Sequence, residues 1–463
     1  MNTQASRFKP TFRRLYSFLK GYLILTLNVF YRRRKVVGYQ ENVPVSGPLL
    51  FTPNHQNALI DALNTASGMP RYRQPSFMTR ADIFTEKTVP ILNHFKMLPI
   101  YRQRDGVDVI KKNEEIFKIV VERMARGECT LIFPEGNHNR EFRLRPIKKG
   151  FGRIAYQVAE ELNFEETVHI VPVGLNYKKH RNFKSDLLII YGKPLSLADY
   201  YSAFEENANR ALVDLKKDLR KAMQACVIHI GTREHYELVN SLRLMGTQFV
   251  AKDMDLNGSD IYDQFKAQKA IIAKVEPALA QDEELAALKE PVAQYEAGLK
   301  TLRLRDHILE EGGRSWGSLM MSAIGFILGL PLHLWGVLNH YHWYKLFDYL
   351  AVKFFKDDHF HASIRHITGY FIIPFAYLLQ SGIVWALTDW RWALGYLALL
   401  PLSGEFAMWY SRAFKKWWAR IRYRRFKTQN NPLLAEMEAT RTKAMKVVKR
   451  LLAKQPDAVR EVV

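Results

Sequence analysis

Residues 49–61 read Leu49-Leu50-Phe51-Thr52-Pro53-Asn54-His55-Gln56-Asn57-Ala58-Leu59-Ile60-Asp61, an apolar strand followed by a helical pattern. Pro53-Asn54 breaks the strand, so His55 is expected on the loop before the helix and Asp61 in the first or second turn of that helix. On one continuous helix a separation of six residues would turn the two side chains apart, whereas this loop-to-helix geometry lets them meet. An imidazole oriented by a carboxylate is typical of a general base. A helix-capping His with an unrelated Asp is the alternative.

A second run also ends an apolar strand on a turn, and reads Leu131-Ile132-Phe133-Pro134-Glu135-Gly136-Asn137-His138-Asn139-Arg140. Gly136 permits the sharp turn that this pattern requires. Five cations then follow within a few residues: Arg140, Arg143, Arg145, Lys148 and Lys149. They can hold a phosphate through charge-assisted hydrogen bonds, or they can form a solvated basic loop. A base with its acid, next to cations for an anionic group, predicts acyl transfer to a phosphate-bearing alcohol.

Short apolar strands alternate with helical stretches through residues 36–195, which predicts an α/β domain with a mixed sheet flanked by helices. Strands are expected at 36–39, 48–52, 76–79, 97–101, 128–133, 168–176 and 187–191. Helices are expected at 57–67, 81–95, 107–126 and 148–162. Arg102 and Arg104 follow the strand at 97–101, at the kind of strand end where ligands of open α/β sheets gather. Pro172 interrupts the strand at 168–176, which suits an edge strand or a bulge.

Outside the α/β domain the composition changes three times. Residues 1–35 carry a short apolar run with basic flanks, predicting an interfacial N-terminal helix, with a helix docked on the core as the alternative. Residues 196–314 are rich in Ala, Glu, Lys and Leu, and predict a helical insert or cap. Residues 412–463 are basic and predict a cytoplasmic tail. Between the last two, 315–411 is apolar and predicts membrane segments.

The apolar region is expected to hold one partial and two full crossings of a bilayer. Residues 367–388 and 391–411 predict a transmembrane hairpin, and the Lys- and Arg-rich stretch that follows places its ends in the cytoplasm. If 318–338 also crossed completely, the α/β domain would lie on the other side, away from cytoplasmic thioesters. A re-entrant or interfacial segment is therefore predicted at 318–338, where Gly325, Gly329 and Pro331 permit a bend.

The charge balance narrows the class of partner. Lys plus Arg number 68 and Asp plus Glu 46, a surplus of 22 positive charges, which favours nucleic acid, an acidic lipid surface or a phosphorylated substrate. Long uncharged segments fit a membrane and not a nucleic-acid binder. The histidines around those segments lack the i, i+3 or i, i+4 spacing of a di-iron site, so no metal is expected. Two cysteines cannot build a disulfide framework and fit a reducing compartment.

Four blocks in order make the chain resemble the PlsC-like glycerolipid acyltransferase family. They are His55 to Asp61, Pro99-Ile100-Tyr101-Arg102, Phe133-Pro134-Glu135-Gly136 and Ile170-Val171-Pro172-Val173-Gly174. The chain departs from the family pattern in the five residues between His55 and Asp61, in Met97 at a usual Gly, and in Asn137-His138-Asn139-Arg140. The first and last departures resemble the fungal-type glycerol-3-phosphate/dihydroxyacetone-phosphate acyltransferase branch, whose members also continue into a helical stretch and apolar segments.

The resemblance implies a role for several residues. His55 would be the general base and Asp61 its partner. Arg102 and Arg140 would bind the acceptor phosphate, Glu135 and Gly136 would shape the acceptor pocket, and Pro172 would border the acyl-donor groove. Charge and position alone add Arg104, Arg145 and His138 as secondary substrate-binding candidates.

The sequence thus predicts a membrane O-acyltransferase of phospholipid biosynthesis whose catalytic domain faces the cytoplasm, in a bacterial inner membrane. It would move a fatty acyl group from acyl-CoA or acyl carrier protein to glycerol-3-phosphate or its 1-acyl product, with no cofactor or metal and with an anionic lipid membrane as partner. The donor and the acceptor stay open at this point. The alternatives are acylation of another acceptor, such as an amino-lipid, and a non-catalytic membrane lipid-binding protein.

Overall fold

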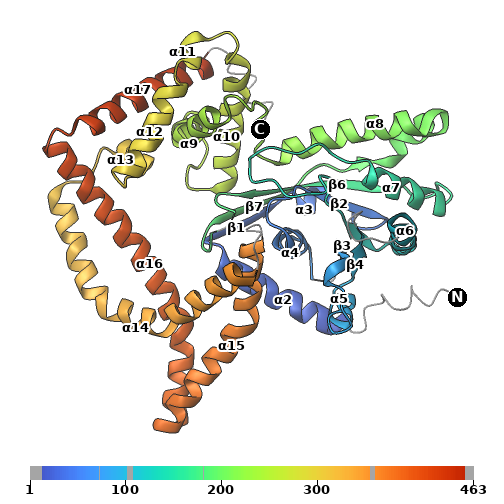
Figure 1. Cartoon of the computed structure of the whole chain (residues 1–463), viewed down its shortest axis with the longest axis horizontal. Coiled ribbons are helices and arrows are strands. Elements are labelled where there is room, and N and C mark those ends of the chain that lie inside the picture. Colours follow the sequence, from blue (N-terminus) through green and yellow to red (C-terminus); the bar gives the residue numbers. More distant parts are fainter. Residues whose placement is uncertain (1–12, 72, 102–107, 181, 355–359, 454–463) are drawn as a thin grey trace. The chain divides into compact units, whose positions relative to one another are not determined.

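A computed structural model describes residues 13–71, 73–101, 108–180, 182–354 and 360–453. The chain divides into two compact units (Figure 1). The first comprises Met1–His229 and Phe355–His366, and the second comprises Ile230–Phe354 and Ile367–Val463. The first unit therefore includes a short segment that lies far from the rest of it in the sequence.

The first unit is built on a sheet of eight strands within the described residues. In chain order these are β1 (Arg33–Val37), β2 (Leu49–Pro53), β3 (Ser76–Arg80), β4 (Met97–Ile100), β5 (Cys129–Leu131), β6 (His169–Tyr177), β7 (Asp186–Tyr191) and β8 (Leu195–Ser196). Their spatial order is β1-β7-β6-β2-β5-β3-β4, with β8 beside β6. The β6–β7 and β6–β8 pairs are antiparallel and the others parallel, so the predicted mixed sheet is confirmed.

Helices cover both faces of this sheet (Figure 1). One face packs against α2 (Arg13–Phe30) and α4 (Leu59–Gly68). The other packs against α6 (Val109–Ala125), α7 (Gly150–Glu161) and α8 (Tyr201–Cys226). The alternation of side chains along β2 explains the two cores, because Leu49 and Phe51 join the first and Leu50 joins the second. The remaining short elements are α3 (Tyr39–Asn42), η1 (Ala81–Ile83), α5 (Val89–His94) and η3 (Leu197–Tyr200).

The N-terminal helix α2 has one face in the core and one face outside it. Leu27 and Phe30 are buried in the α2–α4 core, whereas Phe18 and Leu25 are 71% and 59% exposed. The core-docked alternative therefore describes one face of this helix. An interfacial role for the exposed face stays a prediction.

Of the two predictions for Pro172, an edge strand or a bulge, the edge strand is wrong, because β6 lies inside the sheet between β7 and β2. The missing N–H of Pro172 is tolerated because the neighbour on one side is interrupted there. β8 pairs with His169 and Ile170, and β7 begins pairing only at Val173. The carbonyl of Pro172 still accepts the N–H of Gly192 at 2.9 Å, so Pro172 lies at the end of the β6–β7 ladder, where only the return hydrogen bond is missing.

The second unit is helical in its described residues. Its first helices are α9 (Tyr236–Asp253), α10 (Ile261–Ala278), α11 (Glu283–Ala286), α12 (Lys289–Thr301) and α13 (Asp306–Glu311). The last helix of the chain, α17 (Pro432–Ala453), packs against α9, α10 and α12 and buries an apolar face that includes Leu434, Met437 and Val448. The C-terminal region predicted as a basic tail therefore closes a helical bundle.

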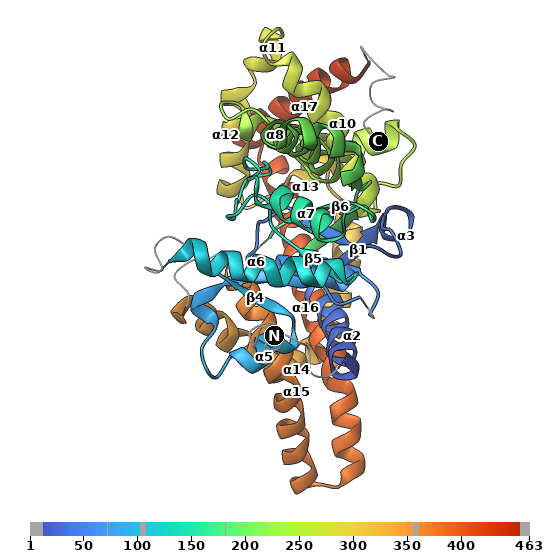
Figure 2. The same ribbon diagram turned by 90° about the vertical axis from the view of Figure 1, so that its right-hand side faces the viewer.

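Three long helices carry the apolar region: α14 (Trp316–Phe354), α15 (His361–Leu387) and α16 (Trp390–Thr428). α14 continues without a break through 318–338, so the bend that a re-entrant segment needs is not formed, and the interfacial alternative stays a prediction. Pro331 lacks the N–H that would bond to the preceding turn, and the helix stays intact around it. Between Leu387 and Trp390 the chain reverses (Figure 2). The Asp389 side chain accepts the N–H groups of Arg391 and Trp392.

Two of the described helices, α14 and α15, are long and apolar enough to cross a membrane, judged by length and composition only. Leu328, Leu338 and Phe375 are among their exposed side chains, and each is at least 72% exposed. α16, which contains the crossing predicted at 391–411, is not one of the two, so that crossing stays a prediction.

Candidate functional site

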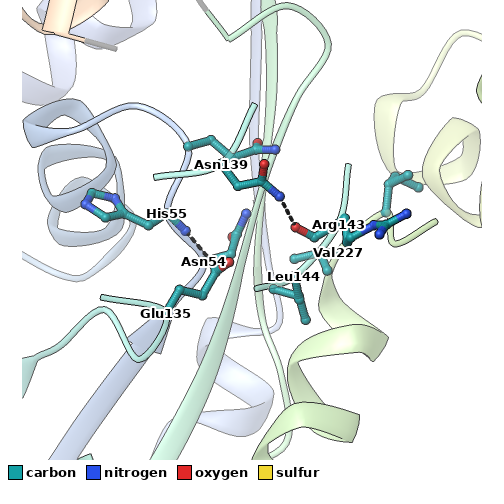
Figure 3. A pocket seen from close by; sticks show the side chains of 9 residues that line it. Asn54, His55, Glu135, Asn139, Arg143, Leu144 and Val227 are labelled. Carbon is teal, nitrogen blue, oxygen red and sulfur yellow. Dashed lines mark hydrogen bonds between the residues drawn. The ribbon is translucent and has the colours of Figure 1, made fainter. Parts of the chain in front are cut away.

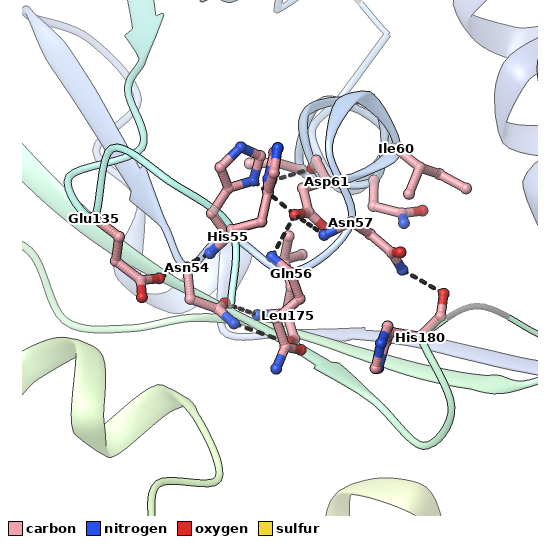
Figure 4. A network of polar contacts seen from close by, with 12 residues as sticks. Asn54, His55, Gln56, Asn57, Ile60, Asp61, Glu135, Leu175 and His180 are labelled. Carbon is pink, nitrogen blue, oxygen red and sulfur yellow. Dashed lines mark hydrogen bonds and ion pairs between the residues drawn. The ribbon is translucent and has the colours of Figure 1, made fainter. Parts of the chain in front are cut away.

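His55 and Asp61 meet at the carboxyl end of β2. β2 ends at Pro53 and α4 begins at Leu59, so His55 lies on the connecting loop and Asp61 is the third residue of the helix. His55 Nδ1 lies 2.8 Å from Asp61 Oδ2 (Figure 4). The contact predicted from the sequence is therefore confirmed.

The carboxylate of Asp61 is fully buried and accepts four hydrogen bonds. Besides His55 Nδ1, its Oδ2 accepts the backbone N–H groups of Gln56 and Asn57, each at 2.7 Å. Its Oδ1 accepts the hydroxyl of Tyr177 at 2.6 Å. Burial raises the pKa of Tyr177 well above its ordinary value, so this phenol stays protonated and donates. Because an ionised carboxylate only accepts, Nδ1 of His55 carries a hydrogen and Nε2 is left as the basic nitrogen.

Two aromatic side chains fix the plane of the His55 ring. Phe133, from the loop after β5, is stacked on it at a centroid distance of 3.8 Å and an angle of 15°. His138 approaches at 4.0 Å with an angle of 61°, and Phe360 in turn meets the ring of His138 edge-on at 5.9 Å. The His55 side chain is 12% exposed, so the imidazole is largely enclosed and still reachable from solvent.

Glu135 is bound to the backbone of the same loop. Its Oε1 accepts the N–H of His55 at 2.9 Å and its Oε2 accepts the N–H of Arg145 at 2.7 Å. Glu135 is 3% exposed, and burial raises its pKa to about 7, although the two N–H donors oppose this shift. The Glu135 carboxylate therefore fixes the backbone of His55. A residue that only bound substrate would not need these two hydrogen bonds to the backbone.

The turn after Glu135 depends on glycine. Gly136 has φ 67° and donates its N–H to Phe133 at 3.0 Å. A Cβ at this position would lie 2.7 Å from Nζ of Lys148. The turn is closed further on by the N–H of Lys148, which donates to the carbonyl of Pro134 at 2.9 Å.

A small hollow lies beside this loop (Figure 3). It is lined by Asn54, His55, Gln56, Glu135, Asn139, Arg143, Leu144, Val227 and Ile228. Figure 3 shows the imidazole of His55 directed away from Arg143 and Leu144, so the hollow lies on the backbone side of His55. Two of its polar walls are fixed, since Asn54 exchanges two hydrogen bonds with the backbone of Leu175 and Asn139 donates to the carbonyl of Arg143 at 2.7 Å.

The other predicted binding residues differ in where they lie relative to His55. Arg102 and Arg104 lie outside the described residues. Arg140 is exposed and follows Asn139, whose N–H donates to the carbonyl of His55 at 3.0 Å. Arg145 directs its guanidinium to the carbonyl of His138 at 3.0 Å. Pro172 is buried in β6 and is not among the residues that line the hollow.

The sequence indicates no role for Tyr177 and Asn54, which the structure brings to the site, and indicates Arg143 only as one of five cations near the second motif. Tyr177 comes from the end of β6, Asn54 precedes His55, and Arg143 lies in the basic loop. Arg143 had a signal, its charge, whereas the donation of Tyr177 to Asp61 depends on strand order. Among the described residues, no group of three or more His, Cys, Asp or Glu side chains is arranged to hold a metal ion.

Comparison with known proteins agrees with this geometry. Residues 34–176 match the family model named Acyltransferase. Glycerol-3-phosphate O-acyltransferase 1 of Saccharomyces cerevisiae is 25% identical over 238 residues, which cover 48% of this chain and 29% of that protein. Glycerol-3-phosphate O-acyltransferase 2 of the same yeast is 32% identical over 108 residues, covering 23% and 14%. The matches agree with the resemblance to the fungal-type branch.

A further relative is an uncharacterised acyltransferase of Schizosaccharomyces pombe, 23% identical over 42% of this chain and 28% of that protein. Among solved structures, the 1-acyl-sn-glycerophosphate acyltransferase PlsC from Thermotoga maritima aligns with a TM-score of 0.33 and 16% identity, over 45% of this chain and 80% of that one. The chain spans less than a third of the length of each curated relative it matches.

Proposed function

We propose that this chain, whose residues 34–176 form a domain of the acyltransferase family, is a membrane glycerolipid O-acyltransferase. It transfers a fatty acyl group from acyl-CoA or acyl carrier protein to glycerol-3-phosphate or 1-acylglycerol-3-phosphate. The observation that carries the proposal is the contact of 2.8 Å between His55 Nδ1 and a buried Asp61 held by three further donors. A carboxylate so fixed orients the imidazole and stabilises its protonated form.

In the proposed mechanism the acceptor hydroxyl approaches Nε2 of His55. As its oxygen attacks the thioester carbonyl, the hydroxyl proton passes to Nε2, and the imidazolium that forms is stabilised by Asp61. The C–S bond then breaks and the thiolate takes the proton from His55, which restores the base. Both described cysteines, Cys129 and Cys226, are buried, which fits direct transfer without an acyl-enzyme.

Cations near the same loop would bind the acceptor phosphate. Arg140 is exposed and directly follows the residue hydrogen-bonded to the His55 carbonyl, which puts its backbone next to the base. Arg102, Arg104, Arg145 and His138 are kept as further binding candidates, and Pro172 as a border of the donor groove. A guanidinium suits a phosphate because its N–H donors pair with two phosphate oxygens at once.

The membrane is the proposed partner of the apolar helices. The proposed crossings are the hairpin at 367–388 and 391–411, in α15 and α16. α14 is not proposed to cross, because residues 360–366, which follow it, belong to the same unit as the sheet. The Lys- and Arg-rich end of α16 suits an anionic cytoplasmic leaflet. We therefore include in the proposal a catalytic unit facing the cytoplasm of a bacterial inner membrane. Fractionation of the native cells, with protease protection of sealed vesicles, tests both parts.

The experiment that tests the activity uses purified full-length protein with labelled acyl donor, and glycerol-3-phosphate and 1-acylglycerol-3-phosphate side by side. Esterification of either acceptor supports the proposal, and the preferred one names the enzyme. Turnover on an amino-lipid alone would support a different acceptor. Binding to anionic vesicles with no turnover would favour the non-catalytic lipid-binding alternative.

A further inference from the structure

A segment far outside the acyltransferase-family domain contacts the loop that carries His55. Ser363 lies in the first turn of α15 and belongs to the first unit. Its Oγ accepts the N–H of Ile60 at 3.0 Å and donates to the carbonyl of Asn57 at 3.1 Å. Ser363 is 1% exposed, so both bonds are made away from water, where they hold geometry best.

The two backbone groups that Ser363 joins lie on either side of a strained residue. Ala58 has φ 48° and ψ −130°, a conformation that a residue with a side chain rarely adopts. Such a backbone persists only when its surroundings hold it. The bridge from Asn57 to Ile60 spans Ala58 and therefore supplies part of that restraint.

The strained turn in turn determines the position of the acid. Asn57, whose carbonyl accepts from Ser363, donates its own N–H to Asp61 Oδ2. Ile60, whose N–H donates to Ser363, is the residue before Asp61. A shift of this turn would therefore move the carboxylate relative to His55, and a displacement of about 1 Å can cost a large part of a catalytic rate.

Two aromatic contacts show that the segment 360–366 is docked along its length. Phe360 meets the ring of His138 edge-on at 5.9 Å, and His138 contacts the ring of His55. At the other end His366 meets Phe30 of α2 edge-on at 5.2 Å. The segment therefore contacts the first unit at three successive points, and Ser363 makes the central contact.

We propose that Ser363 is a positioning residue for the His55–Asp61 pair, so that the catalytic turn is completed by the first turn of a candidate membrane helix. The proposal rests on the proposed function and deepens it. α15 then acts as part of the catalytic unit in addition to any role in the membrane. Residues 34–176, which match the family model, do not include Ser363, so this restraint comes from outside that domain.

The test uses full-length protein in detergent or vesicles, with Ser363→Ala, Ser363→Thr and a matched control, Ser381→Ala. Ser381 is also a buried serine of α15, and its Oγ has no hydrogen-bond partner among the described residues. Ser363→Ala should lower kcat roughly tenfold and leave KM for donor and acceptor within about twofold, because orientation and not binding is lost. Ser363→Thr keeps the hydroxyl and should recover most of kcat, and Ser381→Ala should match the wild type.

A second readout does not depend on the substrate. Diethyl pyrocarbonate modifies unprotonated imidazoles, and peptide mass spectrometry gives its rate at His55 relative to His169 in the same sample. Ser363→Ala should speed modification of His55 at least threefold, because a loosened turn frees the ring from Asp61. If the wild type transfers no acyl group, the proposed function fails, while the change at His55 still supports the positioning role.

The proposal is overturned if Ser363→Ala keeps both kcat and the His55 rate within twofold of Ser381→Ala. It is also overturned if Ser363→Thr is as impaired as Ser363→Ala, since packing and not the hydroxyl would then be responsible.

Discussion

Glu135 Oε1 lies 2.9 Å from the backbone nitrogen of His55, so the carboxylate of one motif holds the main chain at the histidine of another. The same carboxylate also accepts the N–H of Arg145. The two motifs are therefore one structural unit at the carboxyl ends of β2 and β5, which are neighbours in the sheet. This relationship makes the site sensitive to the ionisation of Glu135.

Glu135 should make the stability of the first unit depend on pH. Burial raises its pKa from 4.5 to about 7 in the folded chain, so its contribution to stability is complete below about pH 4.5 and is lost as the pH rises through 7. At about 1.4 kcal/mol per pH unit, the change is on the order of 3 kcal/mol. We expect the thermal unfolding temperature of the wild type, measured relative to that of Glu135→Gln, to decrease as the pH is raised from 5 to 8.

Glu141→Gln is the matched control for this measurement, because Glu141 lies in the same loop and its side chain is 53% exposed. Its difference from the wild type should not vary over that range. A Glu135→Gln difference that is equally flat would show that Glu135 ionises as an ordinary exposed carboxylate does.

Removing the hydroxyl of Tyr177 should slow turnover. Tyr177→Phe deletes one of the four donors to Asp61, and a hydrogen bond to a charged group is worth about 1.5–3 kcal/mol. We expect kcat to fall roughly tenfold with KM nearly unchanged. Tyr191→Phe is the control, since the hydroxyl of this buried tyrosine donates to the carbonyl of Thr65 and not to Asp61. Equal kcat for the two variants would rule out a role for Tyr177 in orienting the acid.

Substitution of Gly136 should lower activity more than substitution of another glycine with positive φ. Gly136→Ala and Gly127→Ala both place a side chain in a left-handed conformation, at a cost of about 1 kcal/mol. The new Cβ at Gly136 would meet the flexible end of Lys148, which can move aside, and nothing lies within 4 Å at Gly127, so the two losses of stability should be similar. The difference lies in the place of Gly136, directly after Glu135, which holds the backbone of His55. We expect a lower unfolding midpoint for both and a marked loss of activity for Gly136→Ala alone, measured by thermal scans and initial rates. Comparable activity in the two alanine variants would contradict the importance assigned to this turn.

Arg140 is the described cation most readily tested for binding of the acceptor phosphate. Arg140→Ala should raise KM for glycerol-3-phosphate or 1-acylglycerol-3-phosphate roughly tenfold, because a charge-assisted hydrogen bond is lost, and leave KM for the acyl donor unchanged. Arg153→Ala removes an exposed arginine from α7 and should change neither. An unaltered acceptor KM in Arg140→Ala would remove this residue from the phosphate site.

Local patterns predict much of the first unit. The seven expected strands are present, because each alternates or runs apolar between turn residues, and only the two-residue β8 was not anticipated. The contact of His55 with Asp61 also follows from local sequence, since the break at Pro53-Asn54 leaves a loop of the required length. The strand order then brings Glu135 beside His55, which the sequence implied only through the family resemblance.

The remaining features depend on contacts between distant segments. Ser363 acts on a residue 303 positions away, and no local pattern marks it. The strain at Ala58 accommodates the long His55–Asp61 spacing, but nothing about an alanine indicates positive φ. Pro172 was expected at an edge or a bulge because the gap between β7 and β8 cannot be read from β6 alone. The continuity of α14 likewise reflects packing and hydrogen bonding that override the bending tendency of its Gly and Pro residues.

The most direct test of the central claim measures acyl transfer by purified full-length wild type, His55→Ala and Asp61→Asn, with glycerol-3-phosphate and 1-acylglycerol-3-phosphate as acceptors. We predict ester formation by the wild type and a loss of at least a thousandfold in kcat for His55→Ala, with a large loss for Asp61→Asn, while both variants still partition with membranes. Turnover near the wild-type rate in both variants would contradict a mechanism in which this imidazole is the base.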